Sequence, residues 1–194
     1  PDSSLANQWI EFYWSFMVGD FNQSLAALHR AEALDPLNFL IKIRIGYVYL
    51  YQRDFGKAIE FFKTLQKHDK SLSIINLSLM DAYGQSKQYK KALDEGIKMW
   101  NSGARAVANA GVFGYYYALT NQKEKAYDLL SDLKNRSNKG YVSSFWIGSI
   151  FFGLGDLDSA FEWFWKACTE RDGNLLYITT TPQFDNLRLD DRYK

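Results

Sequence analysis

The sequence is poor in cysteine and histidine, and these shortages exclude several kinds of site. Of its 194 residues one is cysteine, Cys168, and two are histidine. A single cysteine cannot form an internal disulfide, which fits a reducing compartment without excluding an oxidising one. His29 and His68 lie 39 residues apart with no cysteine or carboxylate at ligand spacing. The sequence therefore offers no metal site.

The chain also lacks an excess of either charge and lacks an apolar run of membrane length. Its 23 basic and 22 acidic residues give a net charge of +1, and no block of like charge forms a surface for nucleic acid. The uncharged runs 106–122 and 140–155 are shorter than the roughly 20 residues of a membrane helix, and both contain polar residues. We expect this domain neither to bind nucleic acid nor to insert into a membrane.

No group of residues has the arrangement of a catalytic site. Cys168 has no histidine near it in the sequence, so we do not expect it to be a nucleophile. The glycine clusters 111–114 and 153–155 lack the preceding strand of a phosphate-binding loop. The Asp190–Asp191 pair is interpreted as a solvated chain end. We therefore predict neither an enzymatic activity nor a cofactor.

What the sequence does have is aromatic residues, at 17%, and an internal repeat of 34 residues. The repeat units are 5–38, 39–72, 73–106, 107–140 and 141–174. Position 8 of the units is Phe12, Gly46, Met80, Gly114 and Gly148, and position 20 is Ser24, Ala58, Ala92, Ala126 and Ala160. Position 11 is Ser15, Tyr49, Tyr83, Tyr117 and Phe151. A fixed period of this size predicts a stack of similar helix pairs.

These positions resemble the tetratricopeptide repeat (TPR) family, whose 34-residue unit is a helix, a turn and a second helix. The resemblance implies an all-α, right-handed superhelical solenoid of about five repeats, forming a single domain over residues 1–194. We expect the turns at Gly19-Asp20, Gly155-Asp156 and the polar segments 52–54, 86–88 and 121–123. Residues 175–194 are predicted to be a C-terminal cap, with a helix from Pro182 to about Asp190 after Thr181 as N-cap.

The two ends of the chain suggest a wider context. The ending that contains Phe184-Asp185, Leu187-Arg188 and Arg192-Tyr193 is similar to the ends of TPR regions in bacterial cyclase-like proteins and winged-helix regulators. It implies the C-terminal part of a larger regulatory or signalling protein, in the cytoplasm, or in the periplasm if that protein is membrane-anchored. The first helix of repeat one is apolar on nearly every side. We expect it to be buried by further repeats upstream or by dimerisation.

In TPR proteins the first helices line a concave groove, and the resemblance places positions 5, 6, 9 and 13 there. Lysine at position 5 and asparagine at position 9, which bind a terminal carboxylate in chaperone-binding TPR proteins, are missing here.

The first hypothesis for the function is a non-catalytic scaffold whose apolar, aromatic groove binds a peptide or partner protein. The alternative is an oligomerisation or sensory domain, for which a homodimer is one form, whose groove is filled by itself or by a small ligand. Burial of Tyr47, Tyr51 and Tyr115 within one monomer would count against the first. The predicted groove residues are Trp9, Tyr13, Arg44, Tyr47, Tyr51, Asp81, Tyr115, Phe145 and Trp146.

Overall fold

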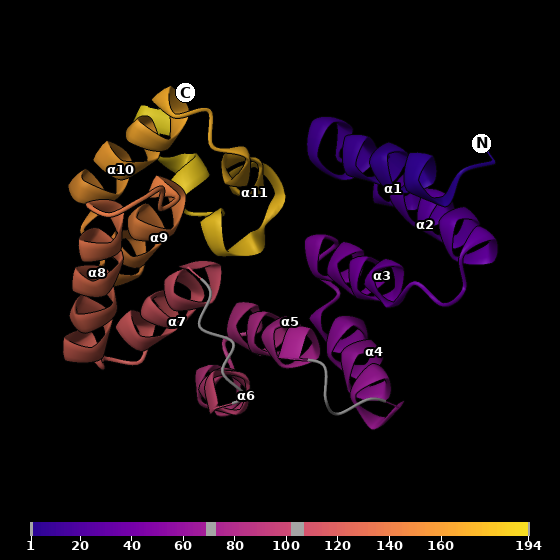
Figure 1. The fold of residues 1–194 in the computed structure, drawn as a ribbon, viewed down its shortest axis with the longest axis horizontal. Helices are drawn as coiled ribbons and strands as arrows, with labels where there is room; N and C mark the ends of the chain where they lie inside the picture. Colours follow the sequence, from indigo (N-terminus) through magenta and orange to yellow (C-terminus); the bar gives the residue numbers. More distant parts are fainter. Residues whose placement is uncertain (1, 69–72, 102–106, 194) are drawn as a thin grey trace. The chain divides into compact units, whose positions relative to one another are not determined.

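The computed structural model describes residues 2–68, 73–101 and 107–193, and all regular structure in these ranges is helical. First and second helices alternate along the chain, as Figure 1 shows. The first helices are α1 (Ser4–Phe12), which continues into the π-helical turn η1 (Tyr13–Val18), then α3 (Phe39–Tyr51), α5 (Ser73–Gln85), α7 (Val107–Leu119) and α9 (Ser144–Leu154). The second helices are α2 (Phe21–Leu34), α4 (Phe55–His68), α6 (Tyr89–Asn101), α8 (Lys123–Ser137) and α10 (Leu157–Thr169).

The chain divides into two compact units. Unit 1 comprises Pro1–Ser86 together with Leu176–Lys194, and unit 2 comprises Lys87–Leu175. In unit 1, α2 packs between α1 and α3, and α3 packs on both α4 and α5. In unit 2, α7 contacts α6, α8 and α9, and α9 also contacts α8 and α10. Each unit is therefore built from helices that pack on their neighbours in sequence and on the next first helix.

The turns inside the helix pairs share one backbone conformation at the spacing of the sequence repeat. A left-handed residue occurs every 34 positions, with φ between 60° and 80°, at Gly19, Arg53, Lys87, Asn121 and Gly155. Such a residue ends a helix by turning the backbone out of the α-helical path. An aspartate follows at three of these turns and caps the next helix, as Asp20 does by accepting hydrogen bonds from Asn22 N and Gln23 N at 3.1 Å. The turn predictions are confirmed.

The small residues of the repeat allow the two helices of a pair to approach closely. A Cβ added to Gly46 would lie 2.3 Å from Phe62 Cε1, and one added to Gly148 would lie 2.8 Å from Phe164 Cδ1. In the second and fifth repeats, the glycine of position 8 thus leaves room for the ring of position 24 on the partner helix. The alanines of position 20, namely Ala58, Ala92, Ala126 and Ala160, are all 0% exposed.

The end of the chain is not the continuous helix predicted for residues 182–190. After η2 (Gly173–Leu175) and a short α11 (Leu176–Thr180), it forms three 3₁₀ turns: η3 (Pro182–Phe184), η4 (Leu187–Leu189) and η5 (Asp191–Tyr193). Pro182 does start η3, but the side chain of Thr181 makes no capping bond. Phe184 and Leu187, each 1% exposed, both point inward, and Arg188 binds the carbonyls of Ile178 and Thr181. These anchors favour a tightly wound segment over a regular helix.

Candidate interaction surface

The first helix of unit 1 has its polar residues inside and its apolar residues outside. Asn7, Glu11 and Ser15 recur every four residues on α1 and η1 and are at most 2% exposed. The residues left exposed between positions 4 and 18 are all large and apolar. They are Leu5 (63%), Trp9 (65%), Ile10 (37%), Tyr13 (53%), Met17 (66%) and Val18 (49%), and we call them the α1 face. A surface helix normally shows the opposite arrangement.

The buried row of α1 is held by a polar network to the next two helices. Glu11 forms an ion pair with Arg44 of α3, and its Oε1 accepts a hydrogen bond from Ser15 Oγ at 2.7 Å. Ser15 Oγ also lies 3.0 Å from Ser24 Oγ of α2, within hydrogen-bond distance. Arg44 Nη2 in addition donates to the carbonyl of Gln8 at 2.8 Å. Because a buried carboxylate is costly without partners, this network fixes the orientation of α1 and leaves its apolar side outward.

Of the predicted groove residues of α3 and α5, Arg44, Tyr47 and Asp81 form a half-buried row, and Tyr51 beside them is buried. Tyr47 donates a hydrogen bond to Asp81 Oδ2 at 3.0 Å. Burial, followed by the nearby negative charge of Asp81, raises the pKa of Tyr47 well above its ordinary value of 10.0. Tyr51 is 6% exposed, and burial together with the neighbouring Tyr177 raises its pKa in the same way. Both tyrosines therefore stay neutral, so their hydroxyl groups can donate hydrogen bonds at any physiological pH.

The C-terminal segment covers part of this row. Tyr177 of α11 meets Phe16 edge to face, with ring centroids 5.7 Å apart, and Phe16 makes a similar contact with Tyr51 at 5.3 Å. Burial and then the charge of Asp81 raise the pKa of Tyr177. Tyr177 therefore lies near acidic and aromatic side chains that were predicted to bind a partner. The chain itself thus fills this part of the row.

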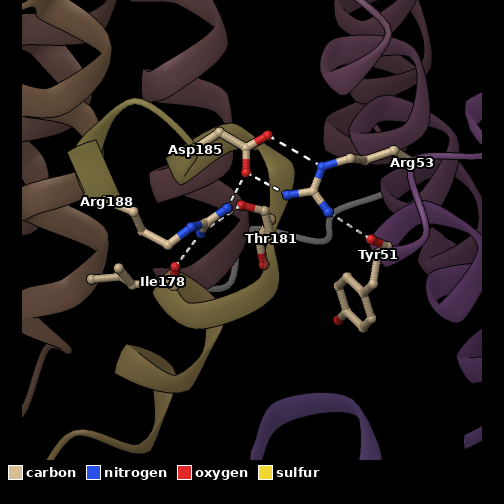
Figure 2. A network of polar contacts seen from close by, with 6 residues as sticks. All are labelled: Tyr51, Arg53, Ile178, Thr181, Asp185 and Arg188. Atoms are coloured by element: carbon tan, nitrogen blue, oxygen red, sulfur yellow. Dashed lines mark hydrogen bonds and ion pairs between the residues drawn. The ribbon is translucent and has the colours of Figure 1, made fainter. Parts of the chain in front are cut away.

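A second contact joins the same segment to the turn between α3 and α4 (Figure 2). Arg53 binds Asp185 through two nitrogens, at 2.5 Å and 3.3 Å, and donates to the carbonyl of Tyr51 at 3.0 Å. Asp185 also pairs with Arg188. The carboxylate thus links an arginine of the turn to an arginine of the C-terminal segment. Since Arg53 and Asp185 are nearly half exposed, we expect this ion pair to add little stability compared with the buried Phe184 and Leu187.

The three predicted groove residues of unit 2 lie on α7 and α9 and pack against neighbouring helices. Tyr115 stacks on Phe152 with the ring planes only 7° apart and is 7% exposed. A Cβ on Gly111 would lie 2.6 Å from that of Trp146, so the half-buried indole rests on the glycine backbone. Phe145 is 1% exposed and contacts Phe164 of α10, with ring centroids 5.9 Å apart. These side chains hold neighbouring helices together.

The start of α9 is fixed by a buried carboxylate from the segment after α10. Asp172, 6% exposed, accepts hydrogen bonds from Ser143 Oγ at 2.5 Å and from Asn174 N and Nδ2 at 3.0 and 2.8 Å. Burial pushes the pKa of Asp172 upward, but the hydrogen bonds from Ser143 and Asn174 outweigh it and hold the pKa below 3.8. Asp172 therefore serves as a structural cap for the last helix pair.

The structure separates the nine predicted groove residues into three groups. Tyr51, Tyr115 and Phe145 are core residues, which corrects the expectation that they line an open surface: neighbouring rings fill the space that the repeat pattern assigned to a groove. Arg44, Tyr47, Asp81 and Trp146 are half-buried, and the first three make the polar contacts given above. Trp9 and Tyr13 are exposed, although the apolar pattern of this helix predicts burial.

Sequence reasoning missed Glu11 and Tyr177, and it named Asp185 only as part of the chain ending, without its ion pair to Arg53. A single charged residue inside an otherwise uncharged helix was the available signal for Glu11. In the described part of the chain, no three metal-binding side chains cluster, and His29 lies beside Glu32 at 3.5 Å. Cys168 is exposed. Over residues 2–68, 73–101 and 107–193, every helix is too short or too polar to cross a bilayer.

Comparison with known proteins supports the fold assignment. No protein-family model and no curated protein matches the chain. Among solved structures the chain is similar to a tetratricopeptide repeat protein from Parabacteroides merdae ATCC 43184, with a TM-score of 0.54 and 13% identity. The match covers 96% of this chain and 72% of that one. At this identity the likeness shows the fold alone, so the chain has an all-helical, TPR-like fold.

Proposed function

We propose that this chain is a non-catalytic scaffold that binds a protein through the first helices of unit 1. The observation that carries the proposal is the α1 face, an uncharged apolar surface with two aromatic side chains more than half exposed. Trp9 and Tyr13 are the anchors, because large aromatic side chains contribute most to binding once they are desolvated. The TPR-like fold agrees with this role, since such repeats offer extended surfaces for binding.

The half-buried row beside the α1 face supplies orientation. Tyr47 is already hydrogen-bonded to Asp81, and Arg44 is already bound to Glu11. Their remaining exposed atoms can therefore make polar contacts with a partner at little cost in conformational freedom. The ion pair of Arg44 with Glu11 also keeps Trp9 and Tyr13 turned outward. We therefore assign Arg44 a positioning role behind the aromatic anchors.

Site-specific crosslinking tests the proposal. A photoreactive amino acid at position 9 or 13 is expected to crosslink one defined protein, whereas the same residue at position 37 is not. Leu37 is a matched control because it is apolar and 94% exposed but lies outside the α1 face. The crosslinked protein, once purified, should bind the wild type and Leu37→Glu alike and Trp9→Glu at least about thirtyfold more weakly. Equal binding by all three would contradict the proposal.

A self-filled oligomerisation or sensory domain remains the second candidate. The specific observation in its favour is that Tyr177 of the chain's own C-terminal segment contacts Phe16 and lies near the predicted partner-binding row. In that case Arg44, Tyr47 and Asp81 need not bind another protein. Substituting Asp81 with alanine would then change oligomeric state or stability but not the affinity for another protein.

The parent protein is proposed to be a bacterial regulator or signalling protein with this domain at its C-terminus. The support is the sequence ending, which is similar to the ends of bacterial TPR regions and whose residues have structural roles here. Phe184 and Leu187 are anchors, Asp185 and Arg188 form an ion pair, and Asp190 pairs with Arg192 at 2.9 Å. Sequencing the full coding region tests this, because a cyclase-like or DNA-binding domain should precede the repeats.

A further inference from the structure

We propose that the α1 face binds the same face of a second copy of this chain, giving a two-fold symmetric dimer. The inference names the partner of the surface described above and rests on that surface being an interaction site. It follows from the repeat itself, from the absence of charge and from the area that is exposed.

The α1 face includes the positions through which later helix pairs stack on earlier ones. In unit 1, positions 6 and 13 of the second repeat are Arg44 and Tyr51, which contact Gln8 and Phe16 of the first repeat. In unit 2 the same positions of the fifth repeat are Trp146 and Gly153.

Trp146 and Gly153 lie against Gly111 and Tyr115 of the fourth repeat. In the first repeat, positions 6 and 13 are Ile10 and Met17, which are 37% and 66% exposed. The α1 face is therefore a helix-stacking surface with no helix on it.

The other first helices show how unusual this exposure is. No residue of α5 or α9 is exposed, and α3 exposes only Leu40, whereas α1 with η1 exposes six large apolar side chains. A contiguous apolar patch of this kind on a water-soluble surface marks an interaction site.

The charge pattern favours a second copy. A two-fold axis places a surface against a copy of itself, so a surface that carried charge of one sign would meet the same sign. The only charged residue between positions 4 and 18 is Glu11, which is 2% exposed and paired with Arg44 inside the molecule. The α1 face can therefore meet itself without repulsion.

The area is also sufficient. With roughly 200 Å² for each large side chain, the exposed fractions correspond to about 600 Å² on each copy. A symmetric contact would bury about 1,200 Å² in total, which reaches the lower end of the range for specific protein interfaces. An interface of this size with two tryptophans and two tyrosines suits a dimer of about micromolar affinity.

Sedimentation equilibrium on the 194-residue chain from about 1 to 200 µM tests the proposal. We expect a monomer–dimer equilibrium that Trp9→Glu weakens at least about thirtyfold and Leu37→Glu leaves unchanged. Because both residues are exposed, neither substitution should alter the thermal midpoint of the monomer. A second variant, Met17→Glu, should reproduce the effect of Trp9→Glu from the far end of the face.

The outcomes separate this inference from the proposed function. A wild-type chain that stays monomeric up to 200 µM overturns the dimer, and so does a dimer that Trp9→Glu and Met17→Glu leave intact. If the monomer still binds another protein through Trp9, the scaffold function stands and the face belongs to a helix pair of a different molecule or of a longer chain. If no association depends on Trp9, both proposals fail.

Discussion

Replacing Gly46 with alanine tests the close approach of the two helices in the second repeat. The new Cβ would lie 2.3 Å and 2.5 Å from Cε1 and Cζ of Phe62, whose side chain is 0% exposed and has no free space to move into. Overpacking of this kind costs up to about 3 kcal/mol, while alanine gains about 1 kcal/mol in helix propensity over glycine. The expected net loss of unfolding free energy is about 2 kcal/mol, or roughly 4–8 °C in thermal midpoint.

The matched control is Gly56→Ala in the first turn of α4. A Cβ there meets only Asp54 Oδ1, at 4.0 Å, so the same substitution should stabilise the chain by about 0.5–1 kcal/mol. Urea unfolding followed by circular dichroism measures both variants. Two substitutions that are chemically identical are thus expected to act in opposite directions.

Shortening the opposing ring should rescue the clash. Phe62→Leu alone costs about 1 kcal/mol, but combined with Gly46→Ala it leaves room for the new methyl group. Repeats one and four already carry leucine at this position, Leu28 and Leu130. Without the clash, the helix-propensity gain of about 1 kcal/mol offsets the loss from Phe62→Leu, so the double variant should be about as stable as the wild type, whereas additivity predicts a loss of roughly 3 kcal/mol. Strict additivity, or stabilisation by Gly46→Ala alone, would refute the reasoning.

Three further substitutions probe the turns, the α1 network and the capping carboxylate. Lys87→Gly should raise the unfolding free energy by about 1 kcal/mol, since Lys87 holds a left-handed φ of 62°; a loss in urea unfolding would contradict this. Arg44→Met should lower it by about 3 kcal/mol because Glu11 is left buried and unpaired, and adding Glu11→Gln should restore part of the loss. The lowered pKa of Asp172 means that its ionised form stabilises the fold above pH 3.8 and that this contribution is lost as the pH falls through the folded pKa. The difference between wild type and Asp172→Asn should therefore shrink between about pH 5 and 2, and a constant difference would exclude this role.

The helix pairs and their turns could be predicted from the sequence because each rests on local requirements that repeat. A glycine or polar residue at every 34th turn position, an aspartate cap after three of them, and alanine at the crossing of two helices act within one pair. The same regularity identified which residues lie on first helices. The likeness to a TPR protein agrees with this reading of the fold.

The candidate site could be predicted only in part, because exposure depends on neighbours that the repeat pattern does not specify. Tyr51 and Tyr115 occupy positions assigned to a groove, but Phe16 and Phe152 fill the space beside them. The helix rules did not predict the 3₁₀ turns of the C-terminal segment, since the burial of Phe184 and the hydrogen bonds of Arg188 to the carbonyls of Ile178 and Thr181 fix its path.

Which side of the first helix faces outward could not be predicted, for a related reason. A helix that is apolar on nearly every side is expected to be buried, but in a single chain the apolar side chains of the α1 face are exposed. The polar network around Glu11, which depends on contacts with α2 and α3, decides which side of the helix turns outward. Neither feature can be read from the helix taken alone.

Hydroxyl-radical labelling of the 194-residue chain, read out residue by residue, tests the central claim most directly. The claim is that the α1 face is an interaction surface covered by a second copy. Trp9, Tyr13 and Met17 should be labelled strongly at about 1 µM and become protected at about 200 µM, above the expected dissociation constant. Trp165, 61% exposed on α10, should be labelled equally at both concentrations. Unchanged labelling of all four residues would contradict the account.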